Sequence, residues 1–277
     1  MRKLYIAIIS LAVLLVVGIV YADTRTVTGE DVVSTHKTVT DSTDLEVLRS
    51  IYQDFVDPKE YSGCTVEFIT TSVFKNIEGD LDTTQMSGVY AATSARMELL
   101  TDSLSVYGDN AVMVADLPHS KELYLTSLDD IDYKKIKRRM MGLALESMFE
   151  DGTVLENTVI PVARGSSGVQ IVGASPDRKI VIKPGSEIIN RLGVDRISIT
   201  FNRDERALRD VLVEYAPDIR VQSTRMQYDA FQWNNVPESF AVPLLQTFFD
   251  EHRVLRSPWE GYTVNDRRYS TASEQQN

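Results

Sequence analysis

The fold is indicated by three neighbouring stretches, MSGVYAATSARMELL at 86–100, SVYGDNAVMVAD at 105–116 and SKELYL at 120–125. Each has the composition of a β-strand, and turn residues interrupt them at 93–94, 108–110 and 118–120. Short connections join only antiparallel neighbours, because a parallel return needs a crossover of a dozen or more residues. The sequence therefore predicts a large antiparallel sheet. None of its residues has the character of a nucleophile, base or metal ligand, so the sheet is interpreted as a binding surface.

Composition limits the class of protein. The chain has 277 residues, of which 43% are hydrophobic and 25% charged, as in an ordinary globular protein. Its formal net charge is −11, which argues against a nucleic-acid partner. The basic segment KKIKRR at 134–139 is the exception. It is either a solvated helix face or a contact for anionic lipid or an acidic partner.

The N-terminus carries an export signal. Arg2 and Lys3 precede an apolar run at 4–20, and Ala22 closes a cleavage motif of small or aliphatic residues. We predict a signal peptide at 1–22, cleaved after Ala22, and a periplasmic protein. The alternative is an uncleaved N-terminal helix that anchors the chain in the inner membrane.

The remaining chain is expected to form one domain at 43–269, between a flexible leader at 23–42 and a polar tail at 270–277. A helix is predicted at 43–56, because Thr43 and Glu46 fit a capping box and apolar residues follow at helical spacing. A second helix is predicted at 130–151 and a short third one at 244–252.

Further strands follow from alternating or β-rich runs. In the strand at 61–76, Cys64, Val66 and Phe68 share one face, and Cys64 is interpreted as a small buried side chain. Other strands are predicted at 158–162, 168–173, 179–183, 196–201, 208–215 and 219–231. The total expected is about nine to eleven strands in an α+β fold.

No motif in the sequence indicates catalysis. His36, His119 and His252 lie far apart without partners at ligand spacing, and no phosphate-binding loop, zinc motif or serine-hydrolase elbow occurs. The single cysteine forms no internal disulfide. We therefore predict a non-enzyme without metal or cofactor.

The segments 87–99 and 106–125 and the C-terminal stretch 197–240 resemble the LolA-like periplasmic carriers of outer-membrane lipoproteins. The resemblance is one of pattern across most of residues 43–240. Thr93 stands near the place where such carriers often have an arginine that latches the lid, so the resemblance does not extend to that contact.

The resemblance implies an incomplete, curved antiparallel β-barrel whose concave face is covered by helices. It implies a monomeric carrier that binds acyl chains of lipoproteins or lipids for transfer to the outer membrane, with inner- or outer-membrane transfer proteins as partners. The alternative is a periplasmic sensor of the same fold that regulates an anti-sigma factor.

An acyl chain would lie in the apolar gap between sheet and helices. The methionines of the second helix are flexible and suit a pocket for variable chains. Which strand face points inward is open by one residue, since a register slip of one exchanges the two faces. The lining is predicted to comprise Phe68, Tyr90, Met97, Leu99, Val112, Met140, Met141 and Met148.

Overall fold

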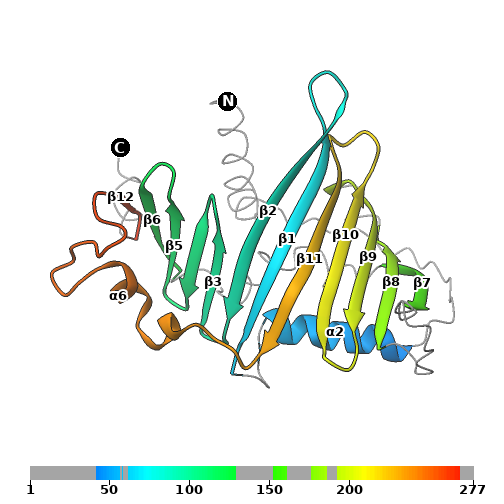
Figure 1. Ribbon diagram of the computed structural model, residues 1–277, viewed down its shortest axis with the longest axis horizontal. Helices are drawn as coiled ribbons and strands as arrows, with labels where there is room; N and C mark the ends of the chain where they lie inside the picture. The colour runs from blue at the N-terminus through cyan, green and yellow to red at the C-terminus, as the bar shows by residue number, and fades with distance from the viewer. Residues whose placement is uncertain are drawn as a thin grey trace, which may run out of the picture.

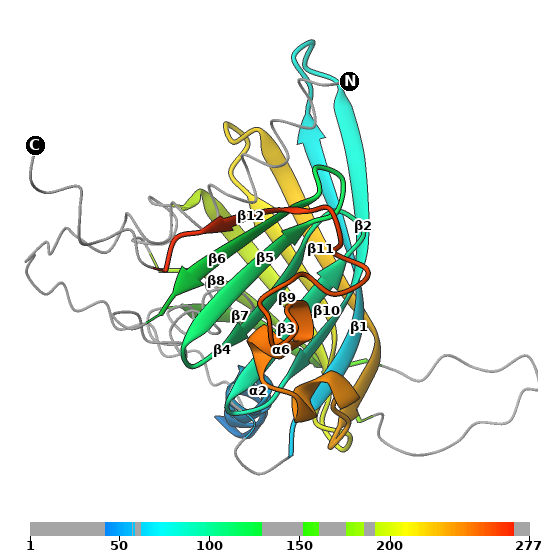
Figure 2. The same ribbon diagram turned by 90° about the vertical axis from the view of Figure 1, so that its left-hand side faces the viewer.

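The computed structural model describes residues 42–56, 58, 62–128, 152–160, 176–185 and 192–268. These residues form one curved, mostly antiparallel sheet of twelve strands (Figure 1; Figure 2). The strand order is β12-β6-β5-β4-β3-β2-β1-β11-β10-β9-β8-β7. The predicted half-barrel-like α+β architecture is thereby confirmed. The predicted helix at 130–151, the strand at 168–173 and both predicted termini lie outside the described residues.

The strands have the following bounds: β1 Cys64–Lys75, β2 Leu81–Ala92, β3 Arg96–Thr101, β4 Ser105–Asp109, β5 Val112–Leu117, β6 Glu122–Ser127, β7 Thr153–Val159, β8 Asp177–Lys183, β9 Val194–Asn202, β10 Ala207–Tyr215, β11 Val221–Trp233 and β12 Thr263–Asp266. The helical segments are α2 at Ser42–Val56, a 3-10 turn η2 at Glu238–Ala241 and α6 at Leu244–Phe248.

The meander from β2 to β6 follows the sequence prediction, because its turn residues make short antiparallel returns. Asp109 accepts hydrogen bonds from the N–H groups of Ala111 and Val112, which fixes the β4–β5 turn. The count of nine to eleven strands is too low. The additional strand, β12, pairs with β6 in parallel, which no feature of the sequence indicated.

The two faces of the sheet carry separate apolar cores. Side chains of α2 pack on one face against β1–β4 and β8–β11. On the other face, Leu244 and Phe248 of α6 pack against Val114 and Leu125 of β5 and β6. The first core lies on the concave side of the sheet, and we call the second face the outer face. Figures 1 and 2 show α2 crossing the lower ends of β8–β11 and α6 beside β3 and β4.

The chain after β11 forms a strap across the outer face, which we define as residues 234–262. It begins where the Asn234 side chain accepts a hydrogen bond from the Ser62 N–H (2.9 Å), and its end leads into β12. The strap explains why apolar residues of β5 and β6 are buried on the outer face although this face lies opposite the main core. Over β4 and β5 the sheet therefore carries apolar residues on both faces.

Candidate functional site: the concave face of the sheet

Register places the apolar residues of neighbouring strands opposite one another on the concave face. Tyr90 of β2 lies between Val66 of β1 and Leu99 of β3. The next pairs along the strands are Ala92 with Met97 and Phe68 with Gly88. Antiparallel partners point to the same face, so these side chains form one continuous apolar surface.

Helix α2 covers one end of this surface. The Phe55 ring contacts Tyr90, Phe231 and Tyr228, with ring centroids 5.1, 5.5 and 6.2 Å apart. Phe55, Leu48 and Ile51 are fully buried, so the predicted apolar stripe of this helix faces the sheet. Tyr228 is buried in the same core, and its burial raises the pKa of its hydroxyl above the ordinary range.

Ion pairs hold both ends of α2 to the sheet. Asp44, which is 5% exposed, lies 3.5 Å from the Arg178 Nε and 3.4 Å from the Arg203 Nη1. At the other end Asp54 pairs with Arg206 at 2.6 Å. A buried carboxylate needs such partners, so the position of the helix on β8–β10 is specified by charge as well as by packing.

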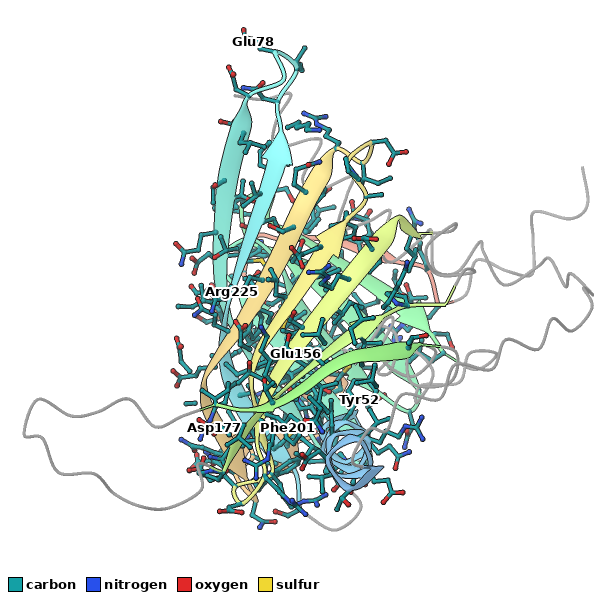
Figure 3. The ribbon with its side chains drawn as sticks, turned by 90° about the vertical axis from the view of Figure 1, so that its right-hand side faces the viewer. Tyr52, Glu78, Glu156, Asp177, Phe201 and Arg225 are labelled. Atoms are coloured by element: carbon teal, nitrogen blue, oxygen red, sulfur yellow. The ribbon has the colours of Figure 1, made fainter. Side chains whose placement is uncertain are left out.

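The concave face extends further along the strands than one helix can cover. Strand β1 has 12 residues and β11 has 13, so each is about 40 Å long. A helix is about 10 Å across, and α2 lies across the strands, so it covers about a quarter of that length. In Figure 3, Tyr52 on α2 lies near one end of the sheet and Glu78, at the tip of the β1–β2 hairpin, at the other.

Two rows of residues cross the concave face near α2, and the Thr70 row meets this helix at its β7 end, where Asn157 donates a hydrogen bond to Asp44 at 3.3 Å. The Thr70 row comprises Met86, Thr70, Met226, Val211, Ile199, Ile180 and Asn157 in successive register. The Ser72 row comprises Thr84, Ser72, Thr224, Val213, Ile197, Ile182 and Val154. Neither row contains an ionisable side chain.

Four of the predicted lining residues lie together on the concave face. Phe68, Tyr90 and Met97 are buried in its core, and Leu99 packs against it. Val112 does not join them: it lies on the outer face, in the core with α6. The concave residue of that strand is its neighbour Met113, one position away. Met140, Met141 and Met148 lie outside the described residues.

Sequence reasoning missed the part of the lining that β8, β10 and β11 supply. The alternation of Ile197 and Ile199 in β9 was visible, and both are fully buried in the concave core. Their neighbours Val211 and Val213 of β10 were not assigned to the site. The register between β9 and β10, which brings Val211 opposite Ile199, places them on the same concave face.

On the outer face, a buried ion pair fastens the strap. The Arg96 guanidinium lies 2.9 Å from the Glu98 carboxylate, and the two side chains are 7% and 5% exposed. Arg96 also donates to the Val242 carbonyl, and to the Thr247 Oγ1 at 3.3 Å. The Ser239 hydroxyl donates to Glu98 at 3.1 Å.

Another buried carboxylate lies under the far end of the strap. The Trp259 indole N–H donates to Asp116 at 2.7 Å. Burial raises the pKa of Asp116 above the usual range, although this hydrogen bond lowers it. Burial, together with the charge of Asp116, raises the pKa of Tyr107 to about 12.

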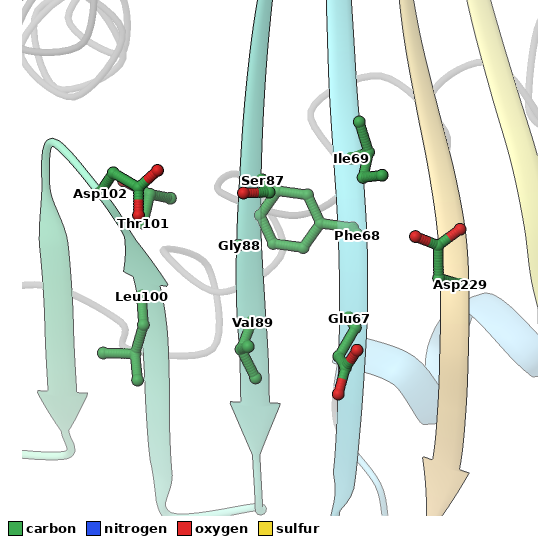
Figure 4. A pocket seen from close by; sticks show the side chains of 10 residues that line it. All are labelled: Glu67, Phe68, Ile69, Ser87, Gly88, Val89, Leu100, Thr101, Asp102 and Asp229. Atoms are coloured by element: carbon green, nitrogen blue, oxygen red, sulfur yellow. The ribbon is translucent and has the colours of Figure 1, made fainter.

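A shallow groove of about 450 Å³ crosses the outer face over β11, β1, β2 and β3 (Figure 4). Val89 and Leu100 lie opposite each other along it. The carboxylates of Glu67, Asp102 and Asp229 line it as well. Asp229 is the extra residue of a β-bulge, because Tyr228 and Ala230 take the partners on β1. The groove is acidic and lies opposite the predicted site.

The structure offers little for chemistry in the described part of the chain. No group of three or more His, Cys, Asp or Glu side chains that could hold a metal is found there. Cys64 is buried in the concave core, as predicted. Among the described residues, no helix is long and apolar enough to cross a membrane.

Comparison with known proteins gives similarity in shape. No family model matches the chain, and a comparison with curated protein sequences gives no match. A solved structure of an uncharacterised conserved protein from Thermus thermophilus has 11% identity over 81% of this chain and 99% of that one, with a TM-score of 0.42. A LolA superfamily protein from Nitrosomonas europaea has 8% identity over 72% and 97%, with a TM-score of 0.32.

The MucA/MucB complex of Pseudomonas aeruginosa contains a chain with 11% identity to this one, a TM-score of 0.34 and coverage of 73% of this chain and 60% of that one. All three TM-scores lie below 0.5. At such values the similarity assigns neither a family nor a function.

Proposed function

We propose that this protein is an exported, non-enzymatic carrier that binds the acyl chains of lipids or lipoproteins on the concave face of its sheet. The observation that carries the proposal is the uncharged character of the two rows that cross the concave face. The Thr70 and Ser72 rows cross seven strands each without an ionisable side chain. Such a surface can hold an apolar chain, whereas it offers no ionisable side chain that could act as a base on its hydroxyl groups.

The energy of binding would come from removal of the chain from water. Each methylene buried contributes about 0.8 kcal/mol, so a chain of a dozen carbons gains roughly 8–10 kcal/mol before the cost of ordering it. This is enough for micromolar or tighter affinity. Release would require a second apolar site, so the partners of the carrier would be membrane-bound transfer proteins. The N-terminal run at 4–20 supports a periplasmic location.

The test uses two half-buried valines on opposite faces. Val213 belongs to the Ser72 row on the concave face, and Val73 of β1 lies on the outer face, one position beyond Ser72. Val213→Asp places an unpaired charge on the proposed binding surface, and Val73→Asp places the same charge on the far side of the sheet. Circular dichroism establishes that both variants are folded.

Displacement of a fluorescent fatty-acid probe measures binding. We expect the wild type and Val73→Asp to bind with similar affinity, and Val213→Asp to bind about 30-fold more weakly or worse. The proposal is refuted if the folded wild type binds no acyl chain. Equal weakening by both substitutions would place the site elsewhere.

A further inference from the structure

The Ser72 row has a chemical polarity that indicates how a ligand lies on it. Its members on β2, β1 and β11 are hydroxyl residues, namely Thr84, Ser72 and Thr224. Its members on β10, β9, β8 and β7 are the aliphatic residues Val213, Ile197, Ile182 and Val154. The change from hydroxyl to aliphatic takes place in one step, between neighbouring strands.

Burial changes along the same row. Thr84 is exposed, Thr224 and Val213 are half-buried, and Ile197 and Ile182 are 0% and 1% exposed. The row is therefore open at its hydroxyl end and closed near its aliphatic end. A ligand that enters from the open side meets the hydroxyl groups first and half-buried Val213 next, and it reaches Ile197 and Ile182 only by displacing the side chains that cover them.

The hydroxyl groups have hydrogen-bonding capacity left. The Ser72 Oγ and Thr224 Oγ1 lie 3.2 Å apart and share one hydrogen bond, so one of their two protons remains available. In the next row, the Thr70 Oγ1 is buried and has no hydrogen-bond partner among the residues that the structure describes. A buried hydroxyl in that state favours a ligand that accepts a hydrogen bond.

Charge restricts the ligand further. The two rows contain no basic side chain that could neutralise an anionic head group, and removal of an unpaired charge from water is costly. An ester or amide carbonyl, which is neutral and accepts hydrogen bonds, matches the hydroxyl end. An acyl chain matches the aliphatic end.

We propose that the concave site recognises a neutral acyl ester, with its carbonyl groups at Thr70, Ser72 and Thr224 and its chain directed toward Ile197 and Ile182. This inference rests on the proposed function and specifies the ligand of the same site. Strands lie about 4.8 Å apart, so the three steps from Thr224 to Ile182 provide about 14 Å for the chain. Two classes of molecule contain such a neutral acyl ester: glycerides, and lipoproteins with their diacylglyceryl group.

The experiment compares competitors with the same acyl chain against the fluorescent fatty-acid probe. They are a monoacylglycerol, a diacylglyceryl-cysteine peptide, a free fatty acid and lysophosphatidylglycerol. The variants Thr70→Val and Thr224→Val remove a hydroxyl at nearly constant volume. Thr71→Val is the matched control, because Thr71 is a half-buried neighbour of Thr70 on the outer face.

We expect the neutral esters to compete better than the two anions. Thr70→Val and Thr224→Val should each weaken the binding of the neutral esters about fivefold and leave the affinity for the fatty acid unchanged. Thr71→Val should change neither affinity. The stronger of the two neutral competitors identifies the source of the ester.

Two results would overturn the inference while the proposed function stands: preference for the anions, or neutral-ester binding that is insensitive to both concave-face variants. If no competitor binds and the probe does not bind, the proposed function itself fails. The two failures are therefore distinguishable.

Discussion

Removal of one partner from the buried Arg96–Glu98 pair should destabilise the protein strongly. In Glu98→Ala the Arg96 guanidinium, 7% exposed in the native protein, loses its counter-ion and keeps only neutral acceptors on Val242 and Thr247. The Ser239 hydroxyl loses its acceptor as well. An unpaired buried charge costs about 3–5 kcal/mol, against a total stability of about 5–15 kcal/mol for a domain.

Urea unfolding followed by circular dichroism measures this loss. The double variant Arg96→Met with Glu98→Ala should lose less free energy of unfolding than its two single variants lose together, because it leaves no charge unpaired. The exposed Arg209–Glu205 pair supplies the control, and Glu205→Ala should change the free energy of unfolding by about 0.5 kcal/mol or less.

The same substitution should loosen the strap before the sheet. Amides of Phe240, Val242 and Gln246, which bond within the strap, should exchange hydrogen faster in Glu98→Ala. The reasoning is wrong if Glu98→Ala loses less than about 1 kcal/mol, since that is the effect of a solvated pair. It is also wrong if exchange in the strap is unchanged.

Two other substitutions test the packing and the electrostatics. Gly88→Ala would place a Cβ 2.7 Å from the Leu100 carbonyl and 2.7 Å from the Phe68 ring, so we expect a loss of about 1–3 kcal/mol in urea unfolding, and unchanged stability would contradict the contact. The raised pKa of Asp116 means that its contribution to stability is greatest below the ordinary carboxyl pKa and declines as pH rises through the folded value. Asp116→Asn can still accept a hydrogen bond from Trp259, but its free energy of unfolding should lack this decline with rising pH. The prediction fails if the free energies of unfolding of the wild type and Asp116→Asn follow parallel curves against pH.

The sheet could be predicted because its evidence is local. Turn residues at 93–94 and 118–120 sit between β-rich runs, and short turns admit only antiparallel neighbours. Helix α2 was predictable for the same reason, since its apolar stripe lies within fifteen residues, although the helix begins at Ser42 and the predicted cap Thr43 therefore lies inside it. Strand β12 was not, because it has only four residues, mostly exposed, and pairs with a strand distant in the sequence.

The lining of the site stays a prediction, because alternation gives two faces of a strand without saying which is concave. Tyr90 and Leu99 lie on the concave face, whereas Val112 lies on the outer face and its neighbour Met113 on the concave one. The sequence left this shift of one position open because the strap makes the outer face of β5 apolar too. No local signal shows that residues 234–262 return to cover that face.

The pairing of β1 with β11 has a consequence for how the chain folds. Cys64 lies opposite Trp233, so the pairing of β1 with β11 joins residues about 170 positions apart. Phe231, which the Phe55 ring contacts, is on β11 as well and is synthesised equally late. Contacts of such sequence separation carry a large loop-closure entropy and form slowly. An amino-terminal fragment that ends before β11 would lack both a neighbour for β1 and most of the aromatic cluster. Because β11 begins at Val221 of 277 residues, completion of the core must await about the last fifth of synthesis. For a chain that crosses a membrane unfolded, this delay would keep it competent for export.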